Sequence, residues 1–483
     1  MKKLIICLLF LTAGSTHAYM GYRSTEAKMS FSATLDVDGR KPTENQAREK
    51  ITDQLQYLYG PMGLSKVKAA PTGSAEEEKI TRLKINPREG GGWRIEYRYT
   101  GIIVLESGPR DFYEIYLPTA AAEDESSPFY TDGFRARRGQ SLNVCTDEHY
   151  QSFDDYWYFW GPKEMEDRKS CPLEKGQHYQ AIRAEIQRIP NTTNTRPDYE
   201  KMADKDGKIH ISLLMGLDDP SASRTEVQWN PFRSADLNAE NYIKIRQLLV
   251  KELGIGTEQH VPWSKEQIAK VVPVRLAILP YVEELSRVYN RQGGKTYEIV
   301  VRLFFAPTGM DEDSTAFHFF LKDAIKNSTL MIYDGHSGLG GNLDLEQIEE
   351  ALKRFRQRQP RLREIEKKHG FKLNPEKGKY QIYFFNSCSS YSYYNEMFFD
   401  RKKEAGRGKD ADQRGTKFLD ILTTGLETPF DGAAKANYYL IRAIHTWAYN
   451  GTDTGYKTIM QRLNMENLIG VNGDEDNPLT TDK

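Results

Sequence analysis

The chain has 483 residues, with 67 lysine and arginine side chains against 68 aspartate and glutamate side chains, and a formal net charge of −1. Phosphate binding needs a surplus of basic side chains, so this balance argues against nucleic acid as a general partner. Hydrophobic residues make up 39% of the chain, as in globular proteins, and the length fits two or three domains of ~100–200 residues each.

The first 18 residues have the pattern of a secretory signal peptide. Lys2 and Lys3 precede an apolar run at 4–11, and Thr-His-Ala at 16–18 offers the small residues that a signal peptidase reads. The apolar run is too short for a transmembrane helix, and no other stretch approaches the ~20 apolar residues that a span needs. We therefore expect cleavage after Ala18 and a soluble protein that is secreted or periplasmic.

Residues 19–262 have the pattern of an α+β region. Strands are predicted at 29–35, 79–85 and 93–106 from their β-branched and aromatic content. A charged amphipathic helix at 43–58 is expected to be ended by Gly60-Pro61. A helix predicted at 235–253 and a shorter one at 264–271 form a bridge to the second half. This region is a pro-region, a substrate-positioning module or a partner-binding domain, and its residues do not decide between the three.

Three cysteines remain after the leader: Cys145, Cys171 and Cys388. Cysteines tend to pair in an oxidising compartment, and Cys145 and Cys171 are close in sequence, so we expect a disulfide between them. On the chain-entropy account this bond contributes roughly 3–4 kcal/mol. Between them lies "YWYFW" at 156–160, which favours a local aromatic core over a platform for stacking a sugar or peptide. Cys388 is then the odd thiol, which pairs between molecules, lies inert in the core, or reacts.

Residues 263–483 alternate between strands and helices. Strands are predicted at 297–306, 329–333, 381–385 and 418–423. Helices are predicted at 314–326, at 345–358 with Asp344 as its N-cap, in a stretch that follows Cys388 and ends at 399, and at 433–449. This alternation predicts an α/β fold, an open sandwich on a mostly parallel sheet. In such sheets the active site lies beyond the carboxyl ends of the strands.

Two of these strand ends have the same arrangement. Four apolar residues and two others precede His336, and four apolar residues and two others precede Cys388. Neighbouring parallel strands would bring the imidazole and the thiol to one crevice, where a histidine favours the thiolate and can protonate a leaving amine. The glycine-rich "GHSGLGG" would let backbone N–H groups approach a ligand, and with the Cys388 amide these could form an oxyanion hole.

This pairing of histidine and cysteine resembles the caspase-like (clan CD) cysteine peptidases, which include caspases, legumains, gingipains and clostripain. The resemblance covers roughly residues 290–450. It implies a secreted cysteine endopeptidase acting on peptides or proteins, with His336 as the base, Cys388 as the nucleophile, and Gly338 with the Cys388 amide as the oxyanion hole. Ser337 directly follows the histidine where the family usually has glycine, and Ser389 follows the cysteine where alanine or glycine is commoner.

The resemblance also points to a substrate pocket near the dyad, since the family builds it from strand ends around these residues. Thr423, Thr424, Gly425 and Glu427 are the candidates, and an acidic residue there favours arginine or lysine before the cleaved bond. Asp334 is a candidate for orienting the imidazole. The basic loop "KKEAGRGKDADQRG" at 402–415 is a candidate site of activating cleavage.

Two other functions stay open. One is a serine hydrolase that uses Ser337 in "GHSGL" as its nucleophile, with Asp420 and His445 completing a Ser-Asp-His triad. Leu339, however, replaces the last glycine of the G-x-S-x-G motif that such enzymes have. The other is a secreted caspase-like binding protein without activity. No cofactor is expected: the acidic stretches at 311–314 and 472–478 favour calcium only weakly, because neither has EF-hand spacing, and no Cys/His group has zinc-ligand spacing.

Overall fold

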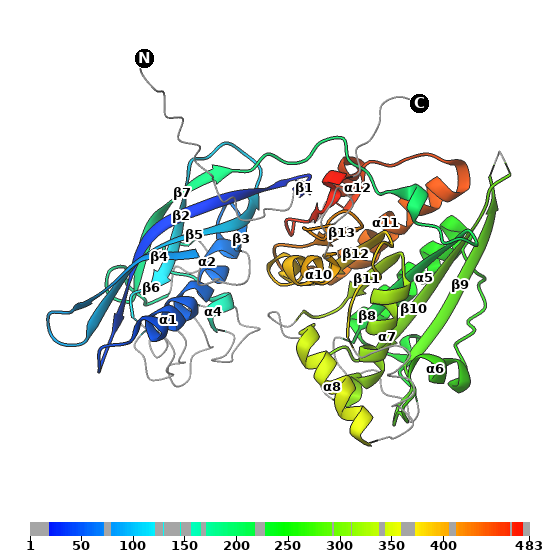
Figure 1. Ribbon diagram of the computed structural model, residues 1–483, viewed down its shortest axis with the longest axis horizontal. Helices are drawn as coiled ribbons and strands as arrows, with labels where there is room; N and C mark the ends of the chain where they lie inside the picture. The colour runs from blue at the N-terminus through cyan, green and yellow to red at the C-terminus, as the bar shows by residue number, and fades with distance from the viewer. Residues whose placement is uncertain are drawn as a thin grey trace, which may run out of the picture.

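The computed structural model describes residues 19–71, 79–120, 129, 145, 156–165, 171–217, 228–291, 294–310, 312–337, 343–358, 372–404, 412–463 and 466–476. These residues form a mixed α/β structure on two sheets, one of six strands and one of eight (Figure 1). Within these ranges no helix is long and apolar enough to cross a bilayer.

The eight-stranded sheet is mixed and mostly parallel. Its central strands β13, β12, β11, β8 and β10 run parallel, whereas β14 and β9 run antiparallel to their neighbours. All residues of β11, β12 and β13 are buried, which is typical of strands covered on both faces. In sheet order the strands are β1 (Tyr19–Gly21), β14 (Gly470–Asn472), β13 (Leu419–Thr423), β12 (Gln381–Asn386), β11 (Leu330–Asp334), β8 (Lys208–Gly216), β10 (Thr296–Ala306) and β9 (Tyr281–Asn290).

Helices cover this sheet. Helices α5 and α11 pack on each other and on β10, and α7 packs on β8 and against α6 and α8. The N-cap prediction for α8 is confirmed, because the Asp344 carboxylate accepts hydrogen bonds at 2.9 Å from two amides of the first turn. The helices are α5 (Leu237–Leu253), α6 (Lys265–Val271), α7 (Thr315–Asn327), α8 (Leu345–Arg358), α10 (Asn395–Lys402), α11 (Phe430–Asn450) and α12 (Tyr456–Leu463). Short 3-10 helices are η3 (Tyr199–Lys201), η4 (Pro231–Arg233), η5 (Glu312–Ser314), η7 (Ser390–Ser392) and η8 (Asp474–Asp476).

The six-stranded sheet is antiparallel, and β5 is its longest-paired strand, with β2 on one side and β3 and β4 on the other. Its strands are β2 (Ser24–Val37), β3 (Ala69–Pro71), β4 (Ile80–Pro87), β5 (Trp93–Glu106), β6 (Phe112–Pro118) and β7 (Tyr179–Arg188), and its helices are α1 (Glu44–Gln56), α2 (Tyr59–Leu64) and α4 (Tyr156–Phe159).

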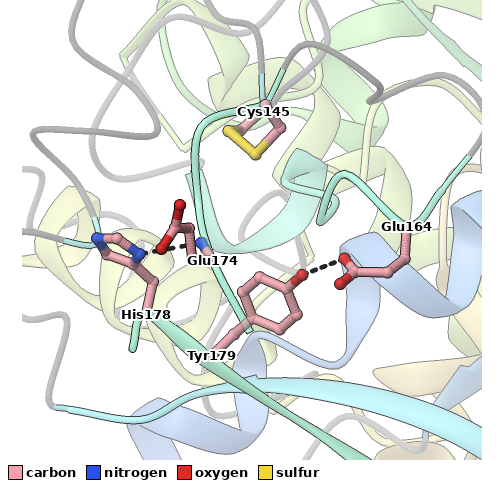
Figure 2. Close-up of a disulfide and its surroundings, with 6 residues drawn as sticks. Cys145, Glu164, Glu174, His178 and Tyr179 are labelled. Atoms are coloured by element: carbon pink, nitrogen blue, oxygen red, sulfur yellow. Dashed lines mark hydrogen bonds between the residues drawn. A yellow bond between two sulfur atoms is a disulfide. The ribbon is translucent and has the colours of Figure 1, made fainter. Parts of the chain in front are cut away.

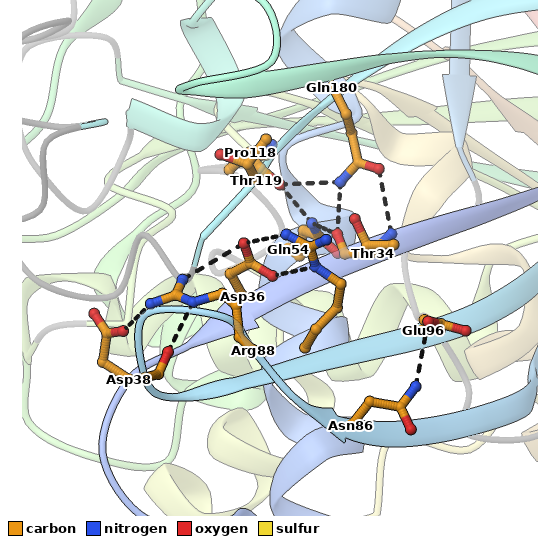
Figure 3. Close-up of polar contacts among 12 residues, drawn as sticks. Thr34, Asp36, Asp38, Gln54, Asn86, Arg88, Glu96, Pro118, Thr119 and Gln180 are labelled. Atoms are coloured by element: carbon orange, nitrogen blue, oxygen red, sulfur yellow. Dashed lines mark hydrogen bonds and ion pairs between the residues drawn. The ribbon is translucent and has the colours of Figure 1, made fainter.

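Side-chain amides hold α1 and the sheet together (Figure 3). Gln54 of α1 donates to the carbonyl oxygens of Thr34, at 2.9 Å, and Pro118, at 2.5 Å. Gln180 of β7 donates to the same Thr34 carbonyl at 2.6 Å. At the rim, Arg94 binds both carboxylate oxygens of Asp36, at 2.7 and 2.9 Å. The helix, β2 and the β6–β7 pair are therefore held as one unit.

The mixed α/β class and the mostly parallel sheet are confirmed. The large sheet, however, takes strands from both sides of residue 262. Strand β1 lies at its edge, and β8 lies between β11 and β10, so two strands of the range 19–262 belong to the same sheet as the range 263–483. In Figure 1 the blue β1 lies next to the orange and red elements of the chain's end.

Helix α1 ends at Gln56, but the Gly60-Pro61 pair lies inside α2 instead of stopping a helix. Pro61 is tolerated because it lies in the first turn, where backbone N–H groups have no partner within the helix. Gly60 is needed for a close approach: a Cβ there would lie 2.3 Å from the carbonyl oxygen of Trp160.

The predicted disulfide between Cys145 and Cys171 is present (Figure 2). Trp160 is fully buried and packs in the same apolar cluster as both cysteines, and its indole N–H donates to the Tyr57 carbonyl at 2.9 Å. Figure 2 also shows the hydroxyl of Tyr179, another member of that cluster, pointing at the Glu164 carboxylate. The disulfide thus anchors the segment that carries α4.

Candidate active site

The ends of β11 and β12 place the histidine and the free cysteine side by side. In this parallel pair Asp334 is opposite Asn386, and each is the last residue of its strand. His336 and Cys388 each lie two residues beyond that pair. Both side chains are partly buried, and both line one cavity of about 530 Å³.

Polar contacts of residues that line the cavity fix these strand ends to α11. The carboxylate of Asp334 accepts a hydrogen bond from the amide of Asn437, whose own oxygen accepts from Asn386 at 3.1 Å. Asn386 also donates to the Ala433 carbonyl at 3.2 Å. Burial raises the pKa of Asp334 to about 7, although the Asn437 contact opposes the shift. The Asp334 carboxylate, a candidate for orienting the imidazole, therefore hydrogen-bonds to α11.

The thiol of Cys388 lies at the wall of the cavity. The backbone N–H of Thr428 donates to its sulfur at 3.4 Å. Burial raises the pKa of Cys388 and the nearby Glu427 carboxylate raises it further, whereas the Thr428 contact lowers it. The sulfur is therefore protonated at neutral pH in this state, and a base has to remove its proton before it can attack.

The turn after the thiol has an unusual backbone. Ser389 has φ 49° and ψ 26°, the left-handed region, which costs a residue other than glycine roughly 1–2 kcal/mol. Its N–H donates to the Leu426 carbonyl at 3.0 Å, and its hydroxyl shares a hydrogen bond with the hydroxyl of Tyr158. Ser390 donates to the Phe385 carbonyl at 2.8 Å. These contacts hold Cys388 at the top of a tight turn.

Ser337 joins the two loops. Its side chain is fully buried, and its hydroxyl donates to the carbonyl oxygen of Cys388. The Tyr333 hydroxyl donates to the carbonyl of His336 in the same loop. Gly338, expected in the oxyanion hole, lies outside the described residues. The amide of Cys388 is the other backbone donor that was expected there.

The far wall of the cavity comes from the six-stranded half of the chain. Helices α2 and α4 contribute Tyr59, Tyr158 and Phe159, and the segment entering β3 contributes Lys68. The ring of Tyr59 is stacked on that of Tyr393, with centroids 6.4 Å apart and planes 7° from parallel. The aromatic run is therefore divided: Trp160 belongs to the core beside the disulfide, and the residues just before it face the cavity.

The candidate specificity residues separate into two groups. Glu427 and Gly425 line the cavity, together with Glu466, which sequence reasoning missed because it comes from the distant segment before β14. Thr423 and Thr424 are fully buried and are not among the described residues that line the cavity. The Thr424 hydroxyl donates to the Ser387 carbonyl, so this side chain supports the turn from below.

The other candidates lie elsewhere. Asp420 is buried in β13 and accepts hydrogen bonds from two tyrosine hydroxyls, and His445 packs edge-on against Tyr289 at 5.2 Å; neither is among the described residues that line the cavity. Lys402, the first residue of the expected cleavage loop, is instead buried at the end of α10, and 405–411 lie outside the described residues. In the described part of the chain, no group of three or more His, Cys, Asp or Glu side chains is arranged to hold a metal ion.

No family model matches the chain, and a search of curated proteins finds no match. The interpretation of the site therefore depends on its own geometry.

Proposed function

We propose that the chain is an exported cysteine endopeptidase whose second half is caspase-like. One observation carries this proposal: His336 and Cys388 occupy equivalent positions beyond two paired parallel strands and line the same cavity. A buried core thiol needs no such partner, whereas a nucleophilic thiol needs a base and room for substrate.

The proposed reaction has two steps. The Cys388 sulfur attacks the carbonyl carbon of the peptide bond while its proton passes to the imidazole of His336. The carbon–nitrogen bond then breaks, the departing amine takes that proton, and the acyl group remains on sulfur as a thioester. Water, deprotonated by His336, hydrolyses the thioester and returns the thiol. The Cys388 amide, with Gly338, stabilises the oxyanion in both steps.

Of the three roles considered for residues 19–262, the cavity favours substrate positioning. Tyr59, Tyr158 and Phe159 give an aromatic wall opposite the strand ends, which suits an extended peptide with apolar side chains. Two carboxylates, Glu427 and Glu466, line the other side and favour a basic side chain next to the cleaved bond.

Export is part of the proposal. The leader pattern at 1–18 is the sequence basis for it, and the disulfide is compatible with an oxidising compartment.

The test is digestion of a proteome-derived peptide library, read by mass spectrometry, with wild-type protein and the variants Cys388→Ala and His336→Ala. We expect cleavage by the wild type and a loss of at least ~100-fold in each variant. His445→Ala is the matched histidine control and should cleave normally. Cleavage that survives Cys388→Ala but not Ser337→Ala would identify the serine hydrolase, and no cleavage by any form would favour the inactive binding protein.

A further inference from the structure

The first strand of the large sheet begins at Tyr19, the residue that follows the expected cleavage position. Tyr19 is 1% exposed, and its ring lies directly on Gly470 of β14, where an added Cβ would meet ring atoms at 2.2 Å. Its hydroxyl shares a hydrogen bond with that of Ser24 at 2.6 Å. Tyr19 is therefore fixed in position as the start of a strand.

A buried carboxylate lies at this strand end. The backbone N–H of Thr192 donates to the Tyr19 carbonyl at 2.8 Å, and the Thr192 hydroxyl lies 3.3 Å from that carbonyl oxygen and 2.6 Å from Oδ2 of Asp474. The Thr195 hydroxyl also donates to Oδ2. The N–H and C=O of one strand residue point to the same side, so the nitrogen of Tyr19 faces the same surroundings.

Asp474 has an unused acceptor. It is fully buried, and its Oδ1 has no hydrogen-bond partner within the described part of the chain. A buried charge without a partner is costly, because it loses its hydration and gains nothing in exchange. Oδ1 therefore marks a place where a hydrogen-bonding cation would stabilise the fold.

The surroundings of Asp474 are acidic. Glu26 of β2, Asp420 of β13 and the adjacent Glu475 are carboxylates of this region. Burial raises the pKa of Glu26 and of Asp420, and the charge of Glu475 raises both further. The cation Arg414 is paired with Glu475 at 3.0 Å. Burial also raises the pKa of Asp474. An additional positive charge would therefore be favoured next to Asp474.

We propose that Asp474 is the counter-ion of the α-ammonium group of Tyr19, which exists only after the leader has been removed. The inference rests on the proposed export, but not on peptidase activity. A signal peptidase adds water across the Ala18–Tyr19 bond, which leaves a carboxylate on Ala18 and an amine on Tyr19. That amine takes up a proton and binds Oδ1, so that leader removal completes the edge of the large sheet.

The pair also acts on the cavity. Strand β14 connects Asp474 to Asn467, whose carbonyl accepts hydrogen bonds from Gly425 and Leu426 at 2.9 and 3.1 Å. Gly425, Leu426 and Asn467 all line the cavity. A chain that keeps extra residues before Tyr19 should therefore have a less ordered wall on that side.

The experiment compares two forms of the otherwise full mature chain, one with Tyr19 free and one with Gly-Ser left in front of it. Each is made as wild type, Asp474→Asn and the exposed-carboxylate control Asp206→Asn. The first measurement is acylation of the α-amine from about pH 6 to pH 9, read by peptide mass spectrometry. We expect the Tyr19 amine to titrate above its ordinary value of about 8, and to return to it in Asp474→Asn.

The second measurement is urea unfolding of all forms. Asp474→Asn should raise the equilibrium constant of unfolding in both forms, and the increase should be about tenfold larger in the free form than in the extended form. Asp206→Asn should not distinguish the two forms. An amine that titrates at about 8 in the native wild type, where no substitution can disturb folding, would overturn the proposal. So would equal losses in the two forms, or an exported protein whose first residue is not Tyr19.

Discussion

Substitution of Ser389 separates the two features of the turn after Cys388. Ser389→Ala keeps the left-handed backbone and removes the hydrogen bond to Tyr158, whose side chain is 8% exposed. The Tyr158 hydroxyl, left buried without this partner, should lower the free energy of unfolding by about 1–3 kcal/mol. Ser389→Gly loses the same bond but relieves the strain of φ 49°, so it should be about 1 kcal/mol more stable than the alanine variant.

The sign of this difference is informative. At an ordinary extended or helical position glycine is less stable than alanine by roughly 0.5–1 kcal/mol, because the unfolded chain gains freedom. The assay is urea unfolding followed by fluorescence and by circular dichroism, with Tyr158→Phe and the double variant added to complete a cycle. We expect a coupling of about 1 kcal/mol between Tyr158 and Ser389.

A glycine variant less stable than the alanine variant would refute the left-handed turn. Additive effects of Tyr158→Phe and Ser389→Ala would refute the contact between the two halves of the chain. The alkylation rate of Cys388 by iodoacetamide gives an independent measurement, since every variant that loses the bond should expose the sulfur and react faster than wild type.

Three further predictions concern other parts of the molecule. The pKa of Asp334 is about 7 in the fold and ~4 in the unfolded chain, so the unfolded chain loses this proton first as pH rises. The free energy of unfolding should therefore fall between about pH 4 and pH 7, by at most ~4 kcal/mol. Urea unfolding across that range should show a shallower slope in Asp334→Asn. Replacing Cys145 and Cys171 by alanine should lower the thermal midpoint through a loss of about 2–5 kcal/mol and speed alkylation of the remaining thiol, because the aromatic wall loses its anchor; unchanged alkylation would contradict that link. Arg246 and Glu283, with 4% and 1% exposed side chains, form a two-bond ion pair at 2.7 and 2.8 Å; Glu283→Gln should cost about 3–5 kcal/mol in calorimetry, and a neutral effect would show that the pair is not isolated from water.

Local patterns predicted the strands and helices that lead to the candidate dyad. Strand β10 was expected at 297–306 and spans Thr296–Ala306, and α8 was expected at 345–358 and spans Leu345–Arg358. Both have a clear period or a continuous apolar run, which a short window of sequence contains. The position of His336 and Cys388 beyond two strands followed from the same patterns.

Long-range pairings were beyond those patterns. The sequence around Lys208–Gly216 does not indicate that this strand inserts between β11 and β10, because strand order depends on contacts between distant segments. The aromatic wall was undetermined for a similar reason. Helix α4 has four residues, too few for a periodic pattern to tell that Tyr158 lines the cavity with Cys388 while Trp160, directly after the helix, packs beside the disulfide. Glu466 likewise reaches the cavity from a segment with no motif.

The place of β8 in the sheet has a consequence for inheritance. The strand precedes residue 262, yet it joins β11 to β10 through parallel pairing on both sides. A gene cut at that residue would encode a second half whose sheet is divided into two unconnected pieces, and a first half with two orphan strands, β1 and β8. Recombination could therefore exchange the aromatic wall between related genes only as an internal cassette, between β1 and β8, and not by joining two halves end to end.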